Sequence, residues 1–336
     1  MPVKPIASAL AAVLLNVTTL TSLEASSASS PLTITARPIS NFLIGSDQKE
    51  FGALTFIGGL EMVSRQSHFG AISGIEFKDG MAWLVTDTGF WINAKLERDE
   101  AGNPTAISAA TFGEITGFDG TRYAEKWQVD AEGIAIDDDG QIVISFERDH
   151  RLSRYQWGNG QLAYVSEERP PVPLYELRQN RGFEGIAIAP AGFIHPRAIV
   201  GIAEKSLDKA GNIMGFVDPT GRDDAYEFSL LRTENYDVTD ISFLPTGDLL
   251  VLERRFNLVQ GISMRLRRVS GSALTERATV DGEMLLEADM SHQIDNMEGL
   301  SITPINDDQV RLTLVSDDNK SLLQRNLLLE FSLKLN

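Results

Sequence analysis

The chain has 336 residues, of which 43% are hydrophobic, and it contains no cysteine. This length allows one large β-domain or two ordinary ones, and the missing cysteine excludes disulfides, thiolate zinc sites and cysteine nucleophiles. The formal net charge of −17 at pH 7 argues against nucleic acid or an anionic membrane surface as a partner.

The first 28 residues differ in composition from the rest of the chain. A lone Lys4 precedes an uncharged stretch, and Ser26 and Ala28 supply the small residues found at cleavage sites. We therefore predict a signal peptide over residues 1–28, a single mature domain over residues 29–336, and a periplasmic or secreted location. An uncleaved anchor or a disordered tail is the alternative. No later segment is long and apolar enough to span a bilayer, so we expect no membrane insertion of the mature chain.

Five similar segments follow along the chain. Each combines a short apolar run, a turn rich in Gly, Pro and Asp, and a second run of branched residues, which is typical of a β-hairpin. The segments begin at Ile72, Ala131, Phe183, Val238 and Met297. Matching positions recur 52 to 59 residues apart, and a period of this size indicates stacked supersecondary units.

Further strand-like pieces between the hairpins, such as residues 152–168, bring each period to four strands. This pattern predicts an all-β fold, a β-propeller with blades of four antiparallel strands. Residues 31–65 and 325–335 are left over, and we expect them to pair as a sixth blade that closes the ring and leaves no long exposed edge. A β-sandwich or a pair of small β-domains is the rival fold.

Acidic residues stand at both ends of these hairpins. Because the two strands are antiparallel, the residue entering the first strand and the residue leaving the second lie at the same end. This reasoning pairs Glu132 with Glu147, Glu184 with Glu204, Asp240 with Glu253, Glu298 with Asp317, and Ser73 with Asp87. We expect a ring of carboxylates around one mouth of the propeller channel. The alternative is that these acids only accept hydrogen bonds from turn amides or pair with adjacent cations.

Crowded carboxylates raise one another's pKa unless a cation neutralises them. Oxygen ligands in this number suit Ca²⁺, with Mg²⁺ or Mn²⁺ next, whereas four scattered histidines make a zinc cluster a poor fit. Basic residues follow the acids, as a substrate with a phosphate or carboxylate group would need. These candidate substrate-binding residues are Arg148, Lys205, Arg254 and Lys320.

Several motifs in this sequence resemble the bacterial family called esterase-like activity of phytase, over roughly Gly59 to the C-terminus. They are "FEGIAI" with "GIAEK", and "NMEGLSITPI" with "TLVSDDNKSLLQRNLLLEFSL". The chain departs from the pattern at Thr239 and Asp240, where other repeats carry Glu and Gly, and at Lys320, where an aromatic residue is commoner. The resemblance implies an exported propeller-like protein with esterase or phytase-type phosphomonoesterase activity.

We therefore predict an exported, metal-dependent hydrolase that acts on a small anionic or ester substrate, either a phosphate or a carboxylic ester. A metal-bound water would be the nucleophile, and the general base would be one of Glu147, Glu204 and Glu253. The residues expected to hold Ca²⁺ are Asp87, Glu132, Glu184, Glu298 and Asp317. The alternatives are a sugar lactonase of the propeller kind, and a non-catalytic exported binding propeller with a structural ion.

Overall fold

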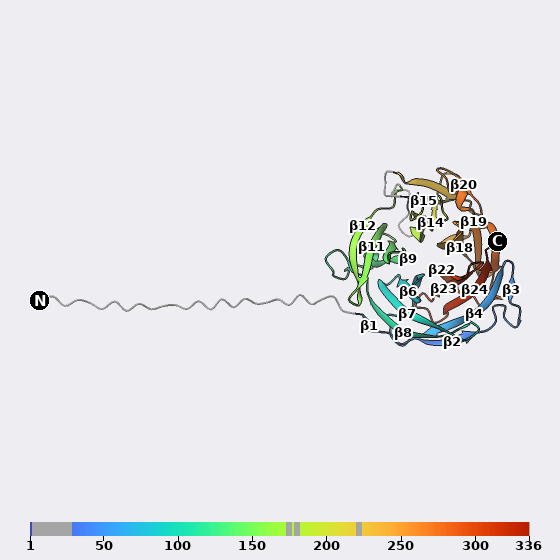
Figure 1. Ribbon diagram of the computed structural model, residues 1–336, viewed down its shortest axis with the longest axis horizontal. Helices are drawn as coiled ribbons and strands as arrows, with labels where there is room; N and C mark the ends of the chain where they lie inside the picture. The colour runs from blue at the N-terminus through green and yellow to red at the C-terminus, as the bar shows by residue number, and fades with distance from the viewer. Residues whose placement is uncertain (2–28, 173–176, 178–181, 220–223, 336) are drawn as a thin grey trace.

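The structure is a computed structural model that describes residues 1, 29–172, 177, 182–219 and 224–335 (Figure 1). The predicted signal peptide, apart from Met1, lies outside the described residues. None of the helices in the described part of the chain is long and apolar enough to cross a membrane.

Within the described residues, the strands form five sheets arranged in a ring (Figure 1). The first sheet contains β5 (Ile72–Lys78), β6 (Met81–Thr86), β7 (Phe90–Arg98), β8 (Pro104–Glu114) and β1 (Ser30–Pro31). The second contains β9 (Ala131–Ile136), β10 (Gln141–Phe146), β11 (Arg151–Gly158) and β12 (Gln161–Glu168). The third contains β13 (Phe183–Ile188), β14 (Ile199–Leu207), β15 (Ile213–Asp218), β16 (Tyr226–Leu230) and β20 (Thr279–Val280).

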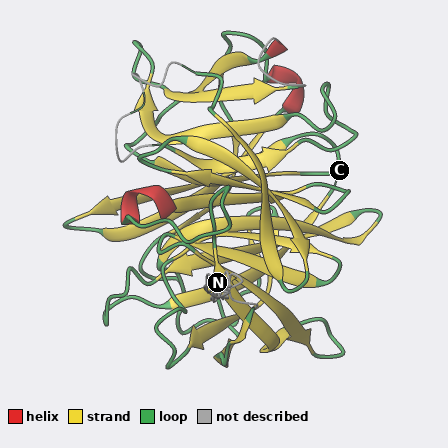
Figure 2. Ribbon diagram, turned by 90° about the vertical axis from the view of Figure 1, so that its left-hand side faces the viewer, coloured by secondary structure: helices red, strands yellow, loops and turns green. Residues whose placement is uncertain are grey.

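The last two sheets complete the ring. The fourth contains β17 (Asp237–Phe243), β18 (Leu249–Asn257), β19 (Gly261–Val269) and β21 (Glu283–Ala288). The fifth contains β22 (Asn296–Asn306), β23 (Gln309–Asp317), β24 (Asn326–Lys334), β4 (Leu54–Val63) and β2 (Thr35–Ile39), with β3 (Glu50–Phe51) paired to β4. The two helical elements α1 (Lys126–Val129) and the 3₁₀ turn η2 (Gly271–Ala273) are short, and most of the molecule drawn in Figure 2 consists of strands and the loops that join them.

The five repeated segments form the inner hairpins of the five blades, as predicted. Strands β5, β9, β13, β17 and β22 are innermost, and each contacts the next around the ring, including β22 with β5. The hydrophobic clusters lie between neighbouring blades; one of them joins Trp91 of the first blade to Ile144 of the second. The predicted all-β propeller is therefore confirmed.

The predicted sixth blade is wrong. The N-terminal strand β4 pairs with the C-terminal strand β24, as expected for closure, with Leu60 opposite Leu328. However, β24 also pairs with β23, so both ends of the chain belong to the same blade as the last repeat. That repeat supplies β22 and β23, the C-terminal end supplies β24, and the N-terminal end supplies β4, which closes the ring at five blades.

Candidate metal centre at one mouth of the channel

The inner strand of every blade has a β-bulge near its start. The regular pairing is interrupted between residues 72 and 74, between 131 and 134, between 183 and 185, between 238 and 240, and between 297 and 299. A bulge redirects a side chain out of the regular alternation, and bulges are common next to functional sites. The residues at these interruptions are Ser73, Glu132, Glu184, Thr239 and Glu298.

The glycine after each acidic bulge residue has a packing reason. A Cβ atom on Gly133 would lie 2.4 Å from the carbonyl oxygen of Glu184, and one on Gly185 would lie 2.9 Å from the backbone nitrogen of Ile241. Glycine therefore lets the inner strand of the next blade approach closely. The repeated Glu-Gly pair turns a carboxylate toward the mouth and packs two blades together.

The first and fourth blades carry hydroxyl groups in place of the acid. Ser73 Oγ donates a hydrogen bond to the carbonyl oxygen of Ala131 at 2.6 Å, and Thr239 Oγ1 donates to that of Met297 at 2.9 Å. Each hydroxyl thus holds the residue before the next blade's glutamate. Asp240 stands where the other blades have glycine, and its carboxylate accepts hydrogen bonds from the backbone of Leu300 at 2.6 Å and Ile241 at 2.8 Å.

A second tier of residues lies where the second strand of each hairpin reaches the same mouth. The backbone N–H groups of Asp87, Glu147 and Glu204 donate to residues just before the inner strands, at 3.1, 2.8 and 2.8 Å. In the last two blades Arg254 lies opposite Asp237, and Asp317 lies opposite Asn296. The fourth blade therefore presents the cation Arg254 at the position where the other blades present a carboxylate.

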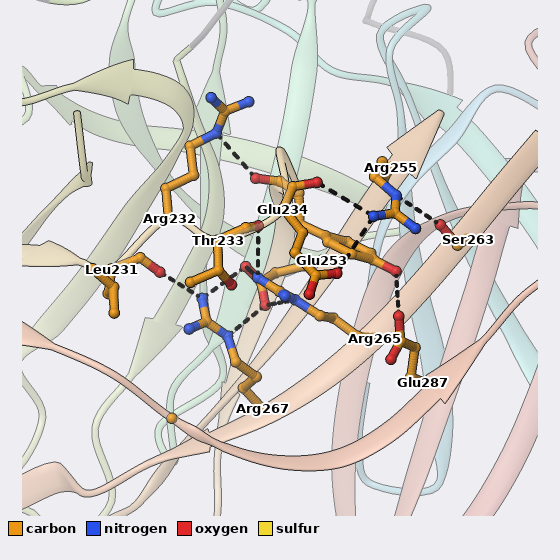
Figure 3. A network of polar contacts seen from close by, with 12 residues as sticks. Leu231, Arg232, Thr233, Glu234, Glu253, Arg255, Ser263, Arg265, Arg267 and Glu287 are labelled. Atoms are coloured by element: carbon orange, nitrogen blue, oxygen red, sulfur yellow. Dashed lines mark hydrogen bonds and ion pairs between the residues drawn. The ribbon is translucent and has the colours of Figure 1, made fainter. Parts of the chain in front are cut away.

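The expected pairing of Asp240 with Glu253 is one residue out of register, because Val238 lies opposite Glu253. Side chains alternate between the two faces of a strand, so Glu253 points away from the face that presents Arg254. Its carboxylate is fully buried and accepts hydrogen bonds from Arg265 at 2.8 and 2.9 Å and from Arg267 at 2.6 and 2.8 Å (Figure 3). Glu253 is therefore held by two arginines and does not face the mouth as a general base would.

The structure brings the remaining acids of the second and third blades together. One oxygen each from Asp130, Glu132 and Glu147 lie within 4.8 Å of one another, and the same holds for Glu147, Glu184 and Glu204. Glu147 belongs to both groups. We call these five residues the acid cluster. Asp130 was not among the sequence-based candidates, although it directly precedes the second repeat; the register of the bulge, which the sequence does not show, places it here.

Glu298 and Asp317 of the fifth blade border the acid cluster. Glu298 Oε1 lies 3.3 Å from Arg254 and accepts a hydrogen bond from the Asn296 side-chain amide at 2.6 Å. Arg254 also lies 3.7 Å from Glu204. Arg254 thus links the fifth blade to the acid cluster. Asp87 of the first blade lies 3.3 Å from Lys126 on α1.

Burial and mutual repulsion raise the pKa of these acids. Burial, together with the charges of Asp130 and Glu204, raises the pKa of Glu147 to about 7, although the Gly182 N–H works in the opposite direction. Burial also raises the pKa of Glu298 and of Asp317 to about 7. The pKa values of Glu132 and Glu184 lie well above the ordinary range, because of burial first and of the neighbouring carboxylates second. Without a cation the site therefore disfavours full ionisation.

Two buried oxygen atoms support a bound cation. Glu298 is only 8% exposed, yet its Oε2 has no hydrogen-bond partner in the described residues, and Oδ1 of Asp87 is likewise buried without one. Unpaired buried polar atoms are costly and usually have a ligand, an ion or a catalytic role. An all-oxygen donor set of carboxylates fits a hard ion such as Ca²⁺. The residues present therefore fit the predicted metal.

The four predicted substrate-binding cations all lie on the side of the mouth, and each already has a partner. Arg148 Nε lies 2.7 Å from Asp130, Lys205 pairs with Asp237, and Arg254 pairs with Glu298 as described above. Lys320 donates to the backbone carbonyls of residues 67 and 69 at 2.9 and 2.6 Å, so it braces a loop of the first blade. Of the four cations, Arg254 joins the largest number of candidate ligands.

A family model described as "Phytase-like: Esterase-like activity of phytase" matches residues 67–320. A comparison with curated proteins gave no match. Among solved structures, the chain is similar to the PQQ-bound aldose sugar dehydrogenase of Streptomyces coelicolor, with 13% identity, coverage of 90% of this chain and 99% of the other, and a TM-score of 0.42. It is also similar to an inactive virginiamycin B lyase variant of Staphylococcus aureus with quinupristin, with 12% identity, coverage of 90% and 99%, and a TM-score of 0.42. Similarities this low carry no argument about function.

Proposed function

The chain belongs to the phytase-like family described as esterase-like activity of phytase, and from this premise we propose that it is a metal-dependent hydrolase of phosphate or carboxylic esters. The observation that carries the proposal is the acid cluster, in which Glu147 is within reach of two other carboxylates on either side. Such crowding is costly in a folded protein unless a cation offsets it.

The proposed ligands of the ion are Glu132, Glu147 and Glu184. Asp130 and Glu204 complete the donor set. The carboxylate oxygens favour Ca²⁺ over softer metals. This assignment keeps Glu132 and Glu184 as predicted ligands and moves Glu147 and Glu204 from candidate bases to candidate ligands. Asp87 and Asp317 stay at the border of the site, where their charges add to the attraction for a cation.

When bound, the ion would polarise the ester and lower the pKa of a nearby water. This proposal moves Glu298 from the predicted ligands to the role of general base, because it borders the acid cluster beside Arg254 and burial raises its pKa to about 7. A base with a pKa near the working pH transfers protons most effectively. Arg254, 3.3 Å from Glu298, would hold the anionic group of the substrate beside that base.

The proposed location is the periplasm or the exterior of the cell. Its support is the composition of residues 1–28, in which an apolar stretch ends in small residues. Free Ca²⁺ is also more abundant outside the cytoplasm than inside it, which suits moderate-affinity extracellular calcium sites.

The test of the proposed function is the hydrolysis of para-nitrophenyl phosphate and para-nitrophenyl acetate before and after metal removal. We expect at least one ester to be hydrolysed, the activity to be lost with a chelator, and the activity to return with Ca²⁺. Glu184→Gln should lower the rate by at least about a hundredfold, whereas Glu283→Gln, an exposed acid on β21, should leave it unchanged. Activity that survives complete metal removal would refute the proposal, and hydrolysis confined to an added sugar lactone would favour a lactonase.

A further inference from the structure

A cavity of about 780 Å³ opens beside the acid cluster, on the side of the first and second blades. Its walls include His68, Phe90, Arg122, Tyr123 and Lys126. This volume is within the range of sites that bind small molecules. Neither the family match nor the proposed role of the acid cluster assigns it a ligand.

The cavity adjoins the acid cluster through the chain itself. Two of its lining residues, Thr88 and Val129, directly follow Asp87 and directly precede Asp130. Lys126 stands at the boundary, since its Nζ lies 3.3 Å from Asp87 Oδ2 and 4.0 Å from Asp130 Oδ1. A group held by Lys126 would therefore lie between the cavity and the candidate metal ligands.

Another part of the cavity wall is aromatic. The His68 ring stacks on Phe112 with 4.4 Å between centroids and meets Phe90 edge-on at 4.9 Å. Phe90 is buried, and the guanidinium of Arg122 lies 5.4 Å from its ring centre. Aromatic surfaces of this kind favour a planar ring, which gains edge and stacking contacts beyond its buried area.

The cations at the cavity are available to an incoming anion. The side chains of Lys126 and Arg122 are 59% and 52% exposed, and their acidic partners are Asp87, Asp130 and Glu114. The ion pairs of Lys126 with Asp87 and of Arg122 with Glu114 are partly exposed and contribute little to stability, so exchanging either for a substrate anion costs little.

We propose that this cavity binds the non-reacting part of the substrate, and that this part is an aromatic ring attached directly to the anionic or ester group. The inference rests on the proposed function, because it takes the acid cluster as the reacting end of the same site. Lys126 contacts the anionic group from the cavity side, in addition to the contact proposed for Arg254, while Phe90 and Tyr123 contact the ring. Aryl esters and aryl phosphates are accordingly the preferred substrate class.

The test is direct binding of three probes to the calcium-loaded protein by isothermal titration calorimetry: phenyl phosphate, cyclohexyl phosphate and inorganic phosphate. We expect phenyl phosphate to bind about tenfold more tightly than inorganic phosphate, and cyclohexyl phosphate to fall between them. Equal affinities for phenyl and cyclohexyl phosphate, or for phenyl and inorganic phosphate, would overturn the inference.

Two variants separate the ring contact from the charge contact. Tyr123→Ala should weaken phenyl phosphate about fivefold or more without changing inorganic phosphate, whereas Lys126→Ala should weaken both. The matched controls are Phe118→Ala, 85% exposed in the same loop, and Lys95→Ala, an exposed lysine paired with Glu97 on β7; both should bind like the parent protein. Tyr123→Ala and Lys126→Ala variants that also bind like the parent would refute the inference.

The same experiment separates this inference from the proposed function. Binding of phenyl phosphate that follows the expected variant pattern, without hydrolysis of any ester, would keep the aromatic subsite and reject the hydrolase. Calcium-dependent hydrolysis that shows no preference for aromatic probes would keep the hydrolase and reject the subsite.

Discussion

Glu147 is the residue on which the two halves of the acid cluster meet, and its protonation should control the stability of the metal-free protein. The pKa values of Glu147, Glu298 and Asp317 are raised to about 7 in the folded state. In the unfolded chain these groups release their protons near the ordinary values of 4.5 for Glu and 3.8 for Asp. Between these limits the folded state binds more protons than the unfolded state, so its stability falls as pH rises.

We predict that the calcium-free protein loses at least about 3 kcal/mol of unfolding free energy between about pH 4.5 and about pH 7. Urea denaturation with a chelator across this pH range measures the effect. Glu147→Gln should flatten the decline, Glu283→Gln should not, and added Ca²⁺ should restore stability at the upper end. A stability that rises with pH across this window would contradict the account.

The hairpin of β18 and β19 contains a buried cluster of charged side chains that lies apart from the candidate metal centre. Glu253 on β18 lies opposite Arg265 on β19, and Arg267 completes a cluster of three charged side chains that are at most 3% exposed (Figure 3). The two arginines also donate to the backbone carbonyls of residues 231 and 233, in the loop that leads into β17, the inner strand of the same blade. The cluster therefore fixes the fourth blade to the loop that precedes it.

Glu253→Gln leaves the buried guanidinium of Arg265 without its counter-charge and leaves Arg267 with only Asp281, 2.8 Å away. We predict a loss of about 3 to 5 kcal/mol of unfolding free energy, with calcium affinity unchanged in the remaining folded protein. Urea denaturation and calorimetric titration on the same variant measure both quantities, with Glu283→Gln as the exposed control. A variant of unchanged stability that loses calcium binding would return Glu253 to the site.

The repeated hairpins, and the gathering of acids from the second and third blades at one end of them, could be predicted from the sequence, because alternating runs, turn residues and antiparallel geometry are local properties. The positions of the bulges could not, because a bulge depends on how the next blade packs against Gly133 or Gly185. This is why Asp240 and Glu253 were paired one residue out of register and why Asp130 was missed. The sequence does depart from the Glu-Gly pattern at Thr239 and Asp240. In the structure these two side chains bond to the backbone of the next blade, at Met297 and Leu300.

At the scale of the whole molecule, the ring closes where β4 of the N-terminal part pairs with β24 at the C-terminus. The repeat count of five was present in the sequence, but the leftover ends were predicted to form a blade by themselves. A blade needs an inner hairpin, and the last repeat provides the one that these ends join. With five blades, the inner strands bring acids from neighbouring blades close enough to share one cation.

The five-bladed ring explains how carboxylates from different repeats come together at one mouth. This gathering needs neither cysteine nor a histidine cluster. Glu132 comes from β9, Glu184 from β13 and Glu298 from β22, so no single blade contains the site. The proposed cation site therefore forms only when the ring assembles, and an ion bound there would stabilise the closed ring by mass action.

The most direct measurement is calorimetric titration of Ca²⁺ into the metal-free protein near neutral pH. The account predicts saturable binding that Glu184→Gln weakens by at least about tenfold and that Glu283→Gln leaves unchanged, since only the former removes a ligand from the acid cluster. No saturable binding by the parent protein, or the same affinity in Glu184→Gln, would contradict the claim that acids from separate blades share a cation at the mouth.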